Sequence, residues 1–410
     1  MPKYDLKPSD VFTPRNAVVN RDMYVSRREI EGRFESALGT SHAILIYGES
    51  GNGKSWLYKE FFSSRDVFFC VVDLNTARSE GFDVALEEAY ISEPTDIKKK
   101  RTRKKGVGLR YVFTAAAEVS SESELLDVRV FERLLRSIRT LAGDRQAFVV
   151  FDNLEQIAHS EDELRKLADC IIRVDNERYA AYEVRMLIVG TPGDLREIIA
   201  RHGDVNTLTN RMRTLPEVGR MTPQEAKKLL QRGFKEFLGL RIESEQKTLD
   251  KILFLSDRVA EQVHALALEI ANFAVEEGAV SNRVVKLGTD AWLSDSLAAV
   301  KDQIRPLMNK KKKDIQRVDQ VIFSLGQIQS ENFSHNDVES IIEKNFPDTV
   351  SGRSGLGVSH IMKNRLSDGD GRIIVPNPNS PTYRISNAKI RMAIRACVVI
   401  EKDGTISMKD

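Results

Sequence analysis

The chain has 410 residues, of which 41% are hydrophobic and 30% are charged, and its formal net charge is +2. This length exceeds one ordinary hydrophobic core, so two or three domains are expected. No uncharged apolar run approaches the ~20 residues needed to cross a bilayer, and the first residues form no apolar signal core. A membrane-spanning protein is therefore excluded, and a soluble cytoplasmic protein is expected.

The cysteines and histidines point to structural roles. Cys70, Cys170 and Cys397 have neither paired nor metal-ligand spacing, so we expect reduced core residues. The six histidines form no helix-spaced cluster with another His or Cys. The sequence therefore predicts neither disulfides nor a zinc site.

A glycine-rich loop follows the first apolar strand, which is predicted at residues 44–47. The loop matches G-x-x-x-x-G-K-[ST] through Gly48, Glu49, Ser50, Gly51, Asn52, Gly53, Lys54 and Ser55. In this motif, glycines let backbone N–H groups surround phosphates, the lysine reaches the outer phosphates and the hydroxyl helps to hold Mg²⁺. Apolar residues at helical spacing then run from Trp56 to Phe62, so the loop opens a helix whose N-terminus favours anions. This order predicts binding of a nucleoside triphosphate.

Three further apolar runs, at residues 67–73, 146–152 and 185–190, predict strands that are buried on both faces. A capping box at Ser160 begins a helix between the last two of these strands. Strands that alternate with helices predict a parallel α/β sheet, which is the P-loop NTPase fold class. We assign residues 1–218 to an N-terminal segment and this core.

A basic insertion is predicted within the core, at about residues 77–125. Its centre, from Lys98 to Arg110, has eight basic and no acidic residues. A segment with this density of positive charge either binds an anion, for example nucleic-acid phosphates, or forms a solvated loop. Both interpretations remain open.

The last sheet strand predicted before the helix at Ser160 ends in Asp152, a carboxylate placed to hold the hydration shell of Mg²⁺. Many hydrolysing P-loop ATPases have a glutamate next, which orients the attacking water, whereas this chain has Asn153. Glu155 is the nearest substitute as catalytic base, and the alternative is a solvent-facing glutamate that begins a helix. This departure implies slow or gated hydrolysis.

Two further domains are predicted after the core. Thr222-Pro223-Gln224-Glu225 caps the first helix of a helical domain at residues 219–300, with further helices from near Ser244 and Asp257. No strand is predicted in this domain. Residues 301–410 combine helices near 315–325, from Ser334 and at about 357–366 with strands at 372–375 and 382–385. Three helices and a two-stranded ribbon predict a winged-helix domain, with Lys363, Asn364 and Arg365 on its third helix.

These residues together resemble the AAA+ ATPases, in particular the initiator-like branch of origin-recognition proteins, transposition-regulator ATPases and STAND-like ATPases. The resemblance covers about Tyr24 to Arg395. It rests on the two nucleotide motifs, on residues 24–30, 188–192 and 210–216, and on the helical lid that follows.

The resemblance implies roles for several residues. Thr191 corresponds to the sensor that contacts the γ-phosphate or the attacking water, although a turn residue before Pro192 is the alternative. Arg211 corresponds to the arginine offered to a neighbouring subunit's γ-phosphate, although a surface arginine is the alternative. In the lid, Glu261 stands where such ATPases often have an arginine that contacts the phosphates, with Arg258 as a possible substitute.

Three functions follow as hypotheses. The first is an ATP- and Mg²⁺-dependent, slowly hydrolysing switch that forms homo-oligomers, contacts double-stranded DNA and recruits or regulates a partner enzyme. The second is a STAND-like regulator of an antiviral defence system, which controls an effector protein without reading DNA. The third is a non-hydrolysing nucleotide-binding scaffold, favoured by Asn153 and Glu261.

Overall fold

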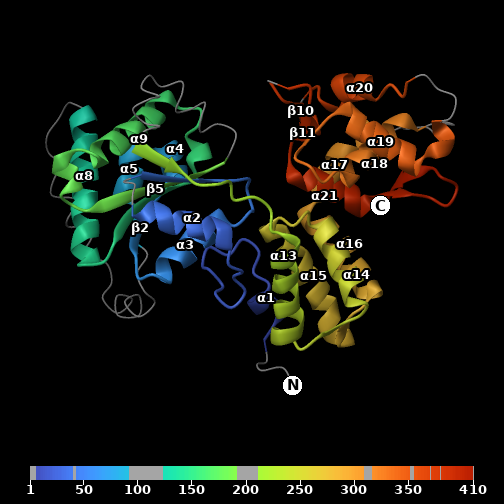
Figure 1. Ribbon diagram of the computed structural model, residues 1–410, viewed down its shortest axis with the longest axis horizontal. Coiled ribbons are helices and arrows are strands. Elements are labelled where there is room, and N and C mark those ends of the chain that lie inside the picture. Colours follow the sequence, from blue (N-terminus) through green and yellow to red (C-terminus); the bar gives the residue numbers. More distant parts are fainter. Residues whose placement is uncertain are drawn as a thin grey trace. The chain divides into compact units, whose positions relative to one another are not determined.

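The computed structural model describes residues 6–39, 43–91, 123–191, 211–308, 316–350, 355–369, 371–378 and 380–409. It divides into two compact units (Figure 1). One comprises residues 16–219, and the other combines the segment up to Arg15 with residues 220–410. The N-terminal segment up to Arg15 therefore groups with the C-terminal half, whereas the sequence placed it with the P-loop core.

The unit of residues 16–219, called here the core unit, is built on one sheet. Its described strands are β1 (Ala43–Tyr47), β2 (Phe68–Asp73), β3 (Tyr90–Ile91), β4 (Ala147–Asp152), β5 (Val184–Gly190) and β6 (Met212–Thr214). They lie in the order β3-β2-β4-β5-β1-β6, and only β3 at the edge pairs antiparallel. The parallel α/β P-loop sheet predicted from the sequence is confirmed, and the short strands β3 and β6 are additions to it.

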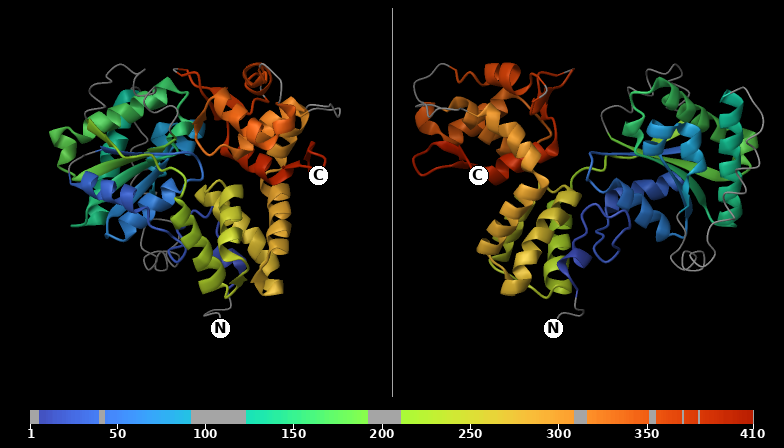
Figure 2. Two further views of the ribbon diagram at one scale, coloured as in Figure 1. Left: turned by 45° about the vertical axis from the view of Figure 1, so that its right-hand side comes forward. Right: turned by 180° about the vertical axis from the view of Figure 1, so that it is seen from behind.

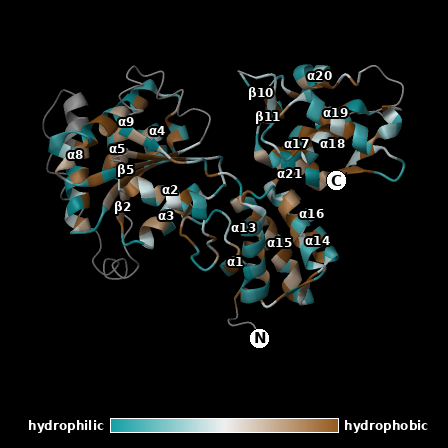
Figure 3. Cartoon of the chain, viewed as in Figure 1, coloured by the Kyte–Doolittle hydropathy of each residue, from teal (hydrophilic) through white to brown (hydrophobic). Residues whose placement is uncertain are grey.

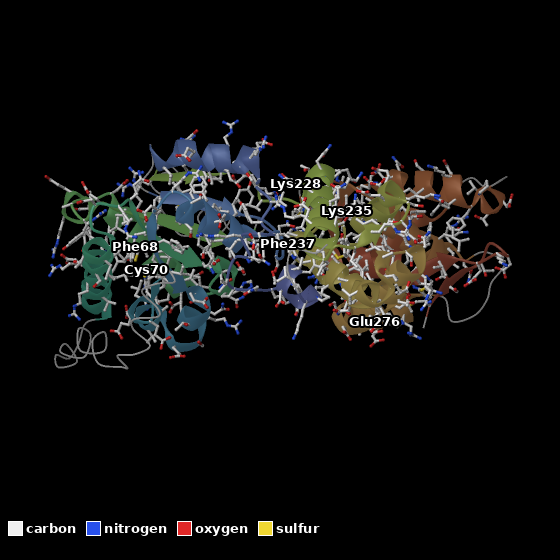
Figure 4. The ribbon with its side chains drawn as sticks, turned by 90° about the horizontal axis from the view of Figure 1, so that it is seen from below. Phe68, Cys70, Lys228, Lys235, Phe237 and Glu276 are labelled. Carbon is white, nitrogen blue, oxygen red and sulfur yellow. The ribbon has the colours of Figure 1, made fainter. Side chains whose placement is uncertain are left out.

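Helices cover both faces of this sheet, because alternate residues of each strand point to opposite sides. On β2, Phe68 and Cys70 (labelled in Figure 4) face one hydrophobic core, whereas Phe69 and Val71 face the other. The second core is covered by α2 (Arg28–Leu38) and α3 (Lys54–Ser63). The first is covered by α4 (Leu74–Glu80), α5 (Phe82–Glu87), α8 (Ser123–Ala142), α9 (Glu161–Val174) and α10 (Glu177–Ala180). The strands are accordingly mostly hydrophobic in Figure 3.

The predicted start of the basic insertion, at about residue 77, is too early. Ala77, Phe82 and Leu86 are at most 2% exposed and pack into the hydrophobic core beside β2. Burial of these apolar side chains makes α4 and α5 part of the core unit. The basic run from Lys98 to Arg110 lies outside the described residues.

The helical lid consists of α13 (Pro223–Gln231), the π-helix η2 (Arg232–Phe237), α14 (Glu245–Leu255), α15 (Ala260–Glu277) and α16 (Asn282–Ser296). Figure 2 shows these helices, in yellow, side by side as a bundle. The predicted capping box is confirmed, since Thr222 Oγ1 accepts from Glu225 N and Glu225 Oε2 accepts from Thr222 N. Contrary to the prediction, two short strands pair within the lid, β7 (Arg241–Ile242) and β8 (Ala279–Val280).

The N-terminal segment packs on the lid through α1 (Pro8–Val11) and the residues after it. Phe12 is fully buried against the rings of Phe234 and His264. Thr13 N donates to His264 Nδ1 at 3.2 Å, and burial lowers the pKa of His264 to about 4. His264 is therefore a neutral structural acceptor at physiological pH, as predicted for the histidines.

The C-terminal part begins with α17 (Ala298–Ile304) and the 3₁₀ turn η3 (Arg305–Leu307). It continues through α18 (Arg317–Gln327), β9 (Asn332–Phe333), α19 (His335–Asn345), η4 (Pro347–Thr349), α20 (Val358–Ile361), the π-helix η5 (Met362–Leu366), β10 (Ile374–Pro376), β11 (Tyr383–Ile385), α21 (Ala388–Cys397), β12 (Val398–Ile400) and β13 (Ile406–Met408). The three predicted helices and the antiparallel β10–β11 ribbon are present. The sequence missed β9, which joins the ribbon through β11, and α21.

One buried carboxylate joins the lid to the C-terminal part. Asp257, in the turn between α14 and α15, is 3% exposed. Arg395 Nη1 donates to its Oδ1 at 2.8 Å, and Arg391 Nη1 donates to its Oδ2 at 3.1 Å. Arg220 adds contacts of 3.3 Å to both oxygens. We call these four residues the Asp257 cluster.

The buried arginines of the Asp257 cluster depend on the negative charge of Asp257. Burial lowers the pKa of Arg395 to about 10 and lowers that of Arg391, while the Asp257 carboxylate opposes both shifts. Arg395 and Arg391 also donate to the backbone carbonyls of Ile328 and Ser330. Removal of the carboxylate would leave buried guanidinium groups without a counter-charge, which is the costly way to break an ion pair.

We therefore expect Asp257→Asn to lower the free energy of unfolding of this unit by about 3 kcal/mol. Asparagine tolerates the left-handed backbone at this position (φ 51°), so the substitution removes mainly the charge. Urea unfolding in a Trp56→Phe background measures the effect, because buried Trp292 in α16 is then the remaining tryptophan.

The matched control is Asp250→Asn on α14, where the carboxylate is 53% exposed and pairs with Lys227. Exposed pairs contribute little to stability, so this variant should unfold like the background protein. Equal unfolding curves for the two variants would contradict a structural role for the Asp257 charge.

Candidate nucleotide site

The loop after β1 is held so tightly that its first residue must be glycine. Gly48 N donates to Gly190 O at 3.2 Å, and Val218 N donates to Tyr47 O at 2.8 Å. A Cβ built on Gly48 would lie 2.3 Å from the backbone oxygen of Val218. Gly51 and Gly53 have φ values of 83° and 88°, in the left-handed region that glycine adopts without strain. The spacing of the motif is thus explained by backbone geometry.

Lys54 lies at the start of α3, with its ammonium group turned back over the loop. Its Nζ donates to Gly48 O at 2.7 Å and to Glu49 O at 3.2 Å. Burial lowers the pKa of Lys54, and the negative charges of Glu155 and Asp152 oppose this shift. The ammonium group is therefore positioned beside the loop, with two carboxylates near it.

The remaining loop residues differ in exposure. Glu49 and Ser50 are exposed at the tip of the loop. Asn52 is 3% exposed, and its Oδ1 has no hydrogen-bond partner among the described residues. A buried acceptor without a partner is costly, and an ordered ligand or water would relieve that cost.

Asp152 at the end of β4 receives three hydrogen bonds. Ser55 Oγ donates to Asp152 Oδ2 at 3.2 Å, and Tyr58 OH donates to the same oxygen at 3.0 Å. Asn153 N donates to Asp152 Oδ1 at 2.9 Å. Burial raises the pKa of Tyr58 well above its usual value, with a further contribution from Asp152, so the phenol remains a donor.

The predicted metal ligands therefore meet. A serine hydroxyl and a carboxylate are the oxygen donors that Mg²⁺ accepts when substrate phosphates and water complete its shell. The described residues contain no cluster of three or more His, Cys, Asp or Glu side chains that would bind a metal without such help. Ser55 and Asp152 would hold the ion, which would neutralise charge on the phosphates.

The residue after Asp152 is Asn153, and its contacts show why it does not take the role that glutamate has in many P-loop ATPases. It adopts a left-handed backbone (φ 66°), and its Nδ2 donates to Asp73 Oδ1 at 2.9 Å. Asp73 ends the neighbouring strand β2 and also caps α4 through Asn75 N. The Asn153 side chain thus links two strand ends, and the amide cannot act as a base.

Glu155 lies in the 3₁₀ turn η1 (Leu154–Gln156), directly after that link. It is partly buried, and its Oε2 has no hydrogen-bond partner among the residues that the structure describes. Its charge is the largest of the carboxylate influences on Lys54. A carboxylate oxygen without a partner has the chemistry that a general base needs.

Thr191 and Arg211 lie at opposite ends of the parallel strands. We call the side of the sheet where these strands end the carboxyl edge, and the side where they begin the amino edge. Thr191 follows Gly190, the last residue of β5, which lies between β4 and β1. It therefore stands at the carboxyl edge, together with the phosphate loop and Asp152. Arg211 precedes β6, whose Met212 pairs with Ala43 at the start of β1, so it lies at the amino edge.

Arg211 is thus separated from its own phosphate loop by the length of β1, or about 15 Å. Its Nε lies 3.3 Å from Asp175 Oδ2, and its Nη1 donates to Ile172 O at 3.4 Å. Both partners belong to the carboxyl end of α9. Arg211 does not share the site of its own chain, which is compatible with action on another subunit.

Arg258 and Glu261, the two lid residues considered at the position of the phosphate-contacting arginine, both contact other residues. Arg258 has a left-handed backbone (φ 58°), and its Nη1 donates to Met221 O at 3.3 Å. Glu261 accepts from Arg15 Nε at 2.8 Å. In this structure both side chains therefore contact other residues of their own unit.

Sequence reasoning missed Tyr58 and Asp73 as parts of this site. In the sequence, Tyr58 lies within the apolar run from Trp56 to Phe62, and Asp73 ends the strand predicted at residues 67–73. Ser55 and Tyr58 are three residues apart and so share a helix face, which was the available signal for Tyr58. The contact of Asp73 with Asn153 required the register of β2 against β4.

Comparison with known proteins places this site in a family. Residues 38–199 match the family model described as an AAA domain. These residues include the phosphate loop and Asp152. The AAA+ P-loop resemblance found in the sequence is thereby confirmed. Comparison with curated proteins gave no match.

Several solved structures resemble the chain over nearly its whole length. The Walker-type ATPase PABY2304 of Pyrococcus abyssi is 15% identical with a TM-score of 0.54, over 92% of this chain and 97% of that one. Cdc6p of Pyrobaculum aerophilum is 14% identical (TM-score 0.43, covering 94% and 96%), and the DNA complex of Aeropyrum pernix ORC1 is 15% identical (0.44, 95% and 96%). At such identity, the likeness to the Pyrococcus protein concerns the fold alone.

Within the described part of the chain, no helix has both the length and the apolar character that a bilayer crossing requires.

Proposed function

We propose that this protein is an ATP-binding, slowly hydrolysing AAA+ switch that uses Mg²⁺ and whose nucleotide state controls its assembly. The observation that carries the proposal is the convergence of Lys54, Asp152 and Glu155 at the carboxyl edge of the sheet. Lys54 and the loop amides would hold the phosphates, and Ser55 and Asp152 would hold the ion. Glu155 would accept a proton from the attacking water, and Thr191 would orient that water or the γ-phosphate.

Homo-oligomeric assembly is supported by the place of Arg211. An arginine at the amino edge of the sheet cannot stabilise charge on the phosphates of its own chain, but it can do so for a neighbouring subunit. Hydrolysis would then depend on assembly, because each complete site needs two chains. The ion pair with Asp175 holds Arg211 at that edge.

Contact with double-stranded DNA is proposed for the C-terminal part, which we interpret as a winged helix. The order α18, β9, α19, α20 with η5, β10 and β11 is that of a helix–strand–helix–helix–ribbon module. Lys363, Asn364 and Arg365 are exposed on η5, where they can contact phosphates or base edges. Through this contact the switch would recruit or regulate a partner enzyme on DNA.

Two alternatives keep specific support. A winged helix can also dock proteins, so a STAND-like regulator of a defence effector would use the same ATP site without DNA. A non-hydrolysing scaffold is favoured by the engagement of Asn153 with Asp73 and of Arg258 with Met221. ATP turnover and mass by light scattering, each with and without duplex DNA, separate the three functions.

Glu155→Gln tests the proposed base. We expect ATP turnover to fall by on the order of 100-fold, because glutamine cannot accept the proton of water. Binding of a fluorescent ATP analogue should stay within about 5-fold of the native value, since one hydrogen bond is worth about 1 kcal/mol at most here.

The matched control is Glu161→Gln in the first turn of α9, where the carboxylate is exposed. Its turnover should equal that of the native protein. Native turnover in Glu155→Gln would remove Glu155 from the site, and no turnover by the native chain under any condition would favour the scaffold.

A mixing experiment tests the action of Arg211 in trans. Lys54→Ala and Arg211→Ala proteins should each be inactive in ATP turnover, because one lacks the phosphate lysine and the other lacks the trans arginine. Their mixture should regain activity, since the intact loop of one chain receives Arg211 from the other.

Asp175→Ala serves as the control for the ion pair, because it frees Arg211 without removing the guanidinium group. It should retain turnover. A mixture as inactive as its two components, with oligomers present by light scattering, would contradict catalysis by Arg211 across subunits.

Lys363→Ala tests DNA contact. Loss of one phosphate contact should weaken duplex binding at every sequence and reduce the slope of log K against log[salt] by about 1. Fluorescence anisotropy with a labelled duplex between low and physiological salt measures both quantities.

Lys402→Ala, in the exposed turn between β12 and β13, removes the same charge from the same domain outside the proposed winged helix. It should leave the salt slope unchanged. Identical DNA binding by native protein and Lys363→Ala would argue against η5 as the contact and would favour the protein-docking alternative.

A further inference from the structure

Tyr58 is a buried phenol that contacts the proposed metal-binding carboxylate and has no place in the phosphate-loop motif. It is 0% exposed, and its ring packs against Phe62 and Phe69. Its OH donates to Asp152 Oδ2 at 3.0 Å. The ring is thus fixed on all sides, and its one polar atom points at Asp152.

The same oxygen also accepts a hydrogen bond from Ser55 Oγ, at 3.2 Å. Ser55 and Tyr58 are three residues apart in α3, so their side chains share one face of the helix. A serine hydroxyl that coordinates a metal ion does so through an oxygen lone pair and keeps its O–H, so it can still donate to Asp152. Ser55, whose hydroxyl would also hold the ion, and Tyr58, which has no other role in the site, both donate to Oδ2, and Asn153 N donates to Oδ1.

We propose that Tyr58 is a positioning residue for Mg²⁺, which acts by fixing the orientation of the Asp152 carboxylate. With both oxygens held from the protein side, the free lone pairs of Asp152 are directed at the hydration shell of the ion. This inference rests on the proposed ATP- and Mg²⁺-dependent function. It adds a residue that sets how much Mg²⁺ the site requires, while ATP contacts through the loop and Lys54 do not involve it.

Tyr58→Phe tests the proposal, since it removes one oxygen and keeps the buried ring. Binding of a fluorescent ATP analogue is titrated with MgCl₂ and compared with binding in EDTA. We expect the Mg²⁺ concentration for half-maximal effect to rise by on the order of 5-fold, the worth of one hydrogen bond. Affinity in EDTA should be unchanged.

Tyr179→Phe is the matched control, because Tyr179 is a buried tyrosine on α10 whose ring stacks on Phe131. It should show the native Mg²⁺ requirement. A double-mutant cycle provides the second measurement: in an Asp152→Asn background, Tyr58→Phe should cause no further change, because its effect passes through the carboxylate.

Three results would overturn the proposal. The first is a native Mg²⁺ requirement in Tyr58→Phe. The second is an equal loss of binding in EDTA and in Mg²⁺, which would mean that the hydroxyl only supports packing. The third is a full Tyr58→Phe effect in the Asp152→Asn background. If the native protein binds no ATP analogue with or without Mg²⁺, the proposed function falls as well, which distinguishes the two failures.

Discussion

The carboxylate of Asp152 is the point at which the elements of the site are tied together. Asp152 is the last residue of β4. Its carboxylate accepts hydrogen bonds from the Ser55 and Tyr58 side chains of α3 and from the backbone N–H of Asn153 in the following turn. Because parallel strands bring their carboxyl ends to one edge, this carboxylate meets the phosphate loop of β1 across the intervening β5. Other nucleotide contacts depend on that edge being held in register.

The cost of burying charge shapes the molecule at two places. At the nucleotide site, Lys54 is partly desolvated beside the carboxylates of Asp152 and Glu155, an arrangement ready to receive a phosphate. In the other unit, Asp257 neutralises arginines of α21, and burial of these groups is tolerated only because they are paired. One set of buried charges can serve a ligand, and the other supports a junction between lid and C-terminal part.

The departures from the usual ATPase pattern have a structural reason. The amide of Asn153 donates to Asp73 at the end of β2. Arg258 and Glu261 contact Met221 and Arg15 within their own unit. The replacement of the adjacent glutamate and of a lid arginine is in line with the slow hydrolysis that we propose.

The P-loop fold class, the main strands of the sheet, the loop from Gly48 to Ser55 and its partner Asp152 can be predicted from the sequence. These features depend on local rules: apolar periodicity, capping residues and glycines at positions that a side chain cannot occupy. The short strands β3, β7, β8 and β9 escaped prediction because two residues carry no detectable alternation.

Which distant residues meet depends on the packing of the folded chain. The roles of Tyr58 and Asp73 depend on packing of α3 and on the register of β2 against β4. The placement of Arg211 at the amino edge follows from the pairing of β6 with β1, and Arg391 and Arg395, which pair with Asp257, lie more than a hundred residues from it. Such contacts are fixed by how elements pack against one another, and no spacing along the chain records that.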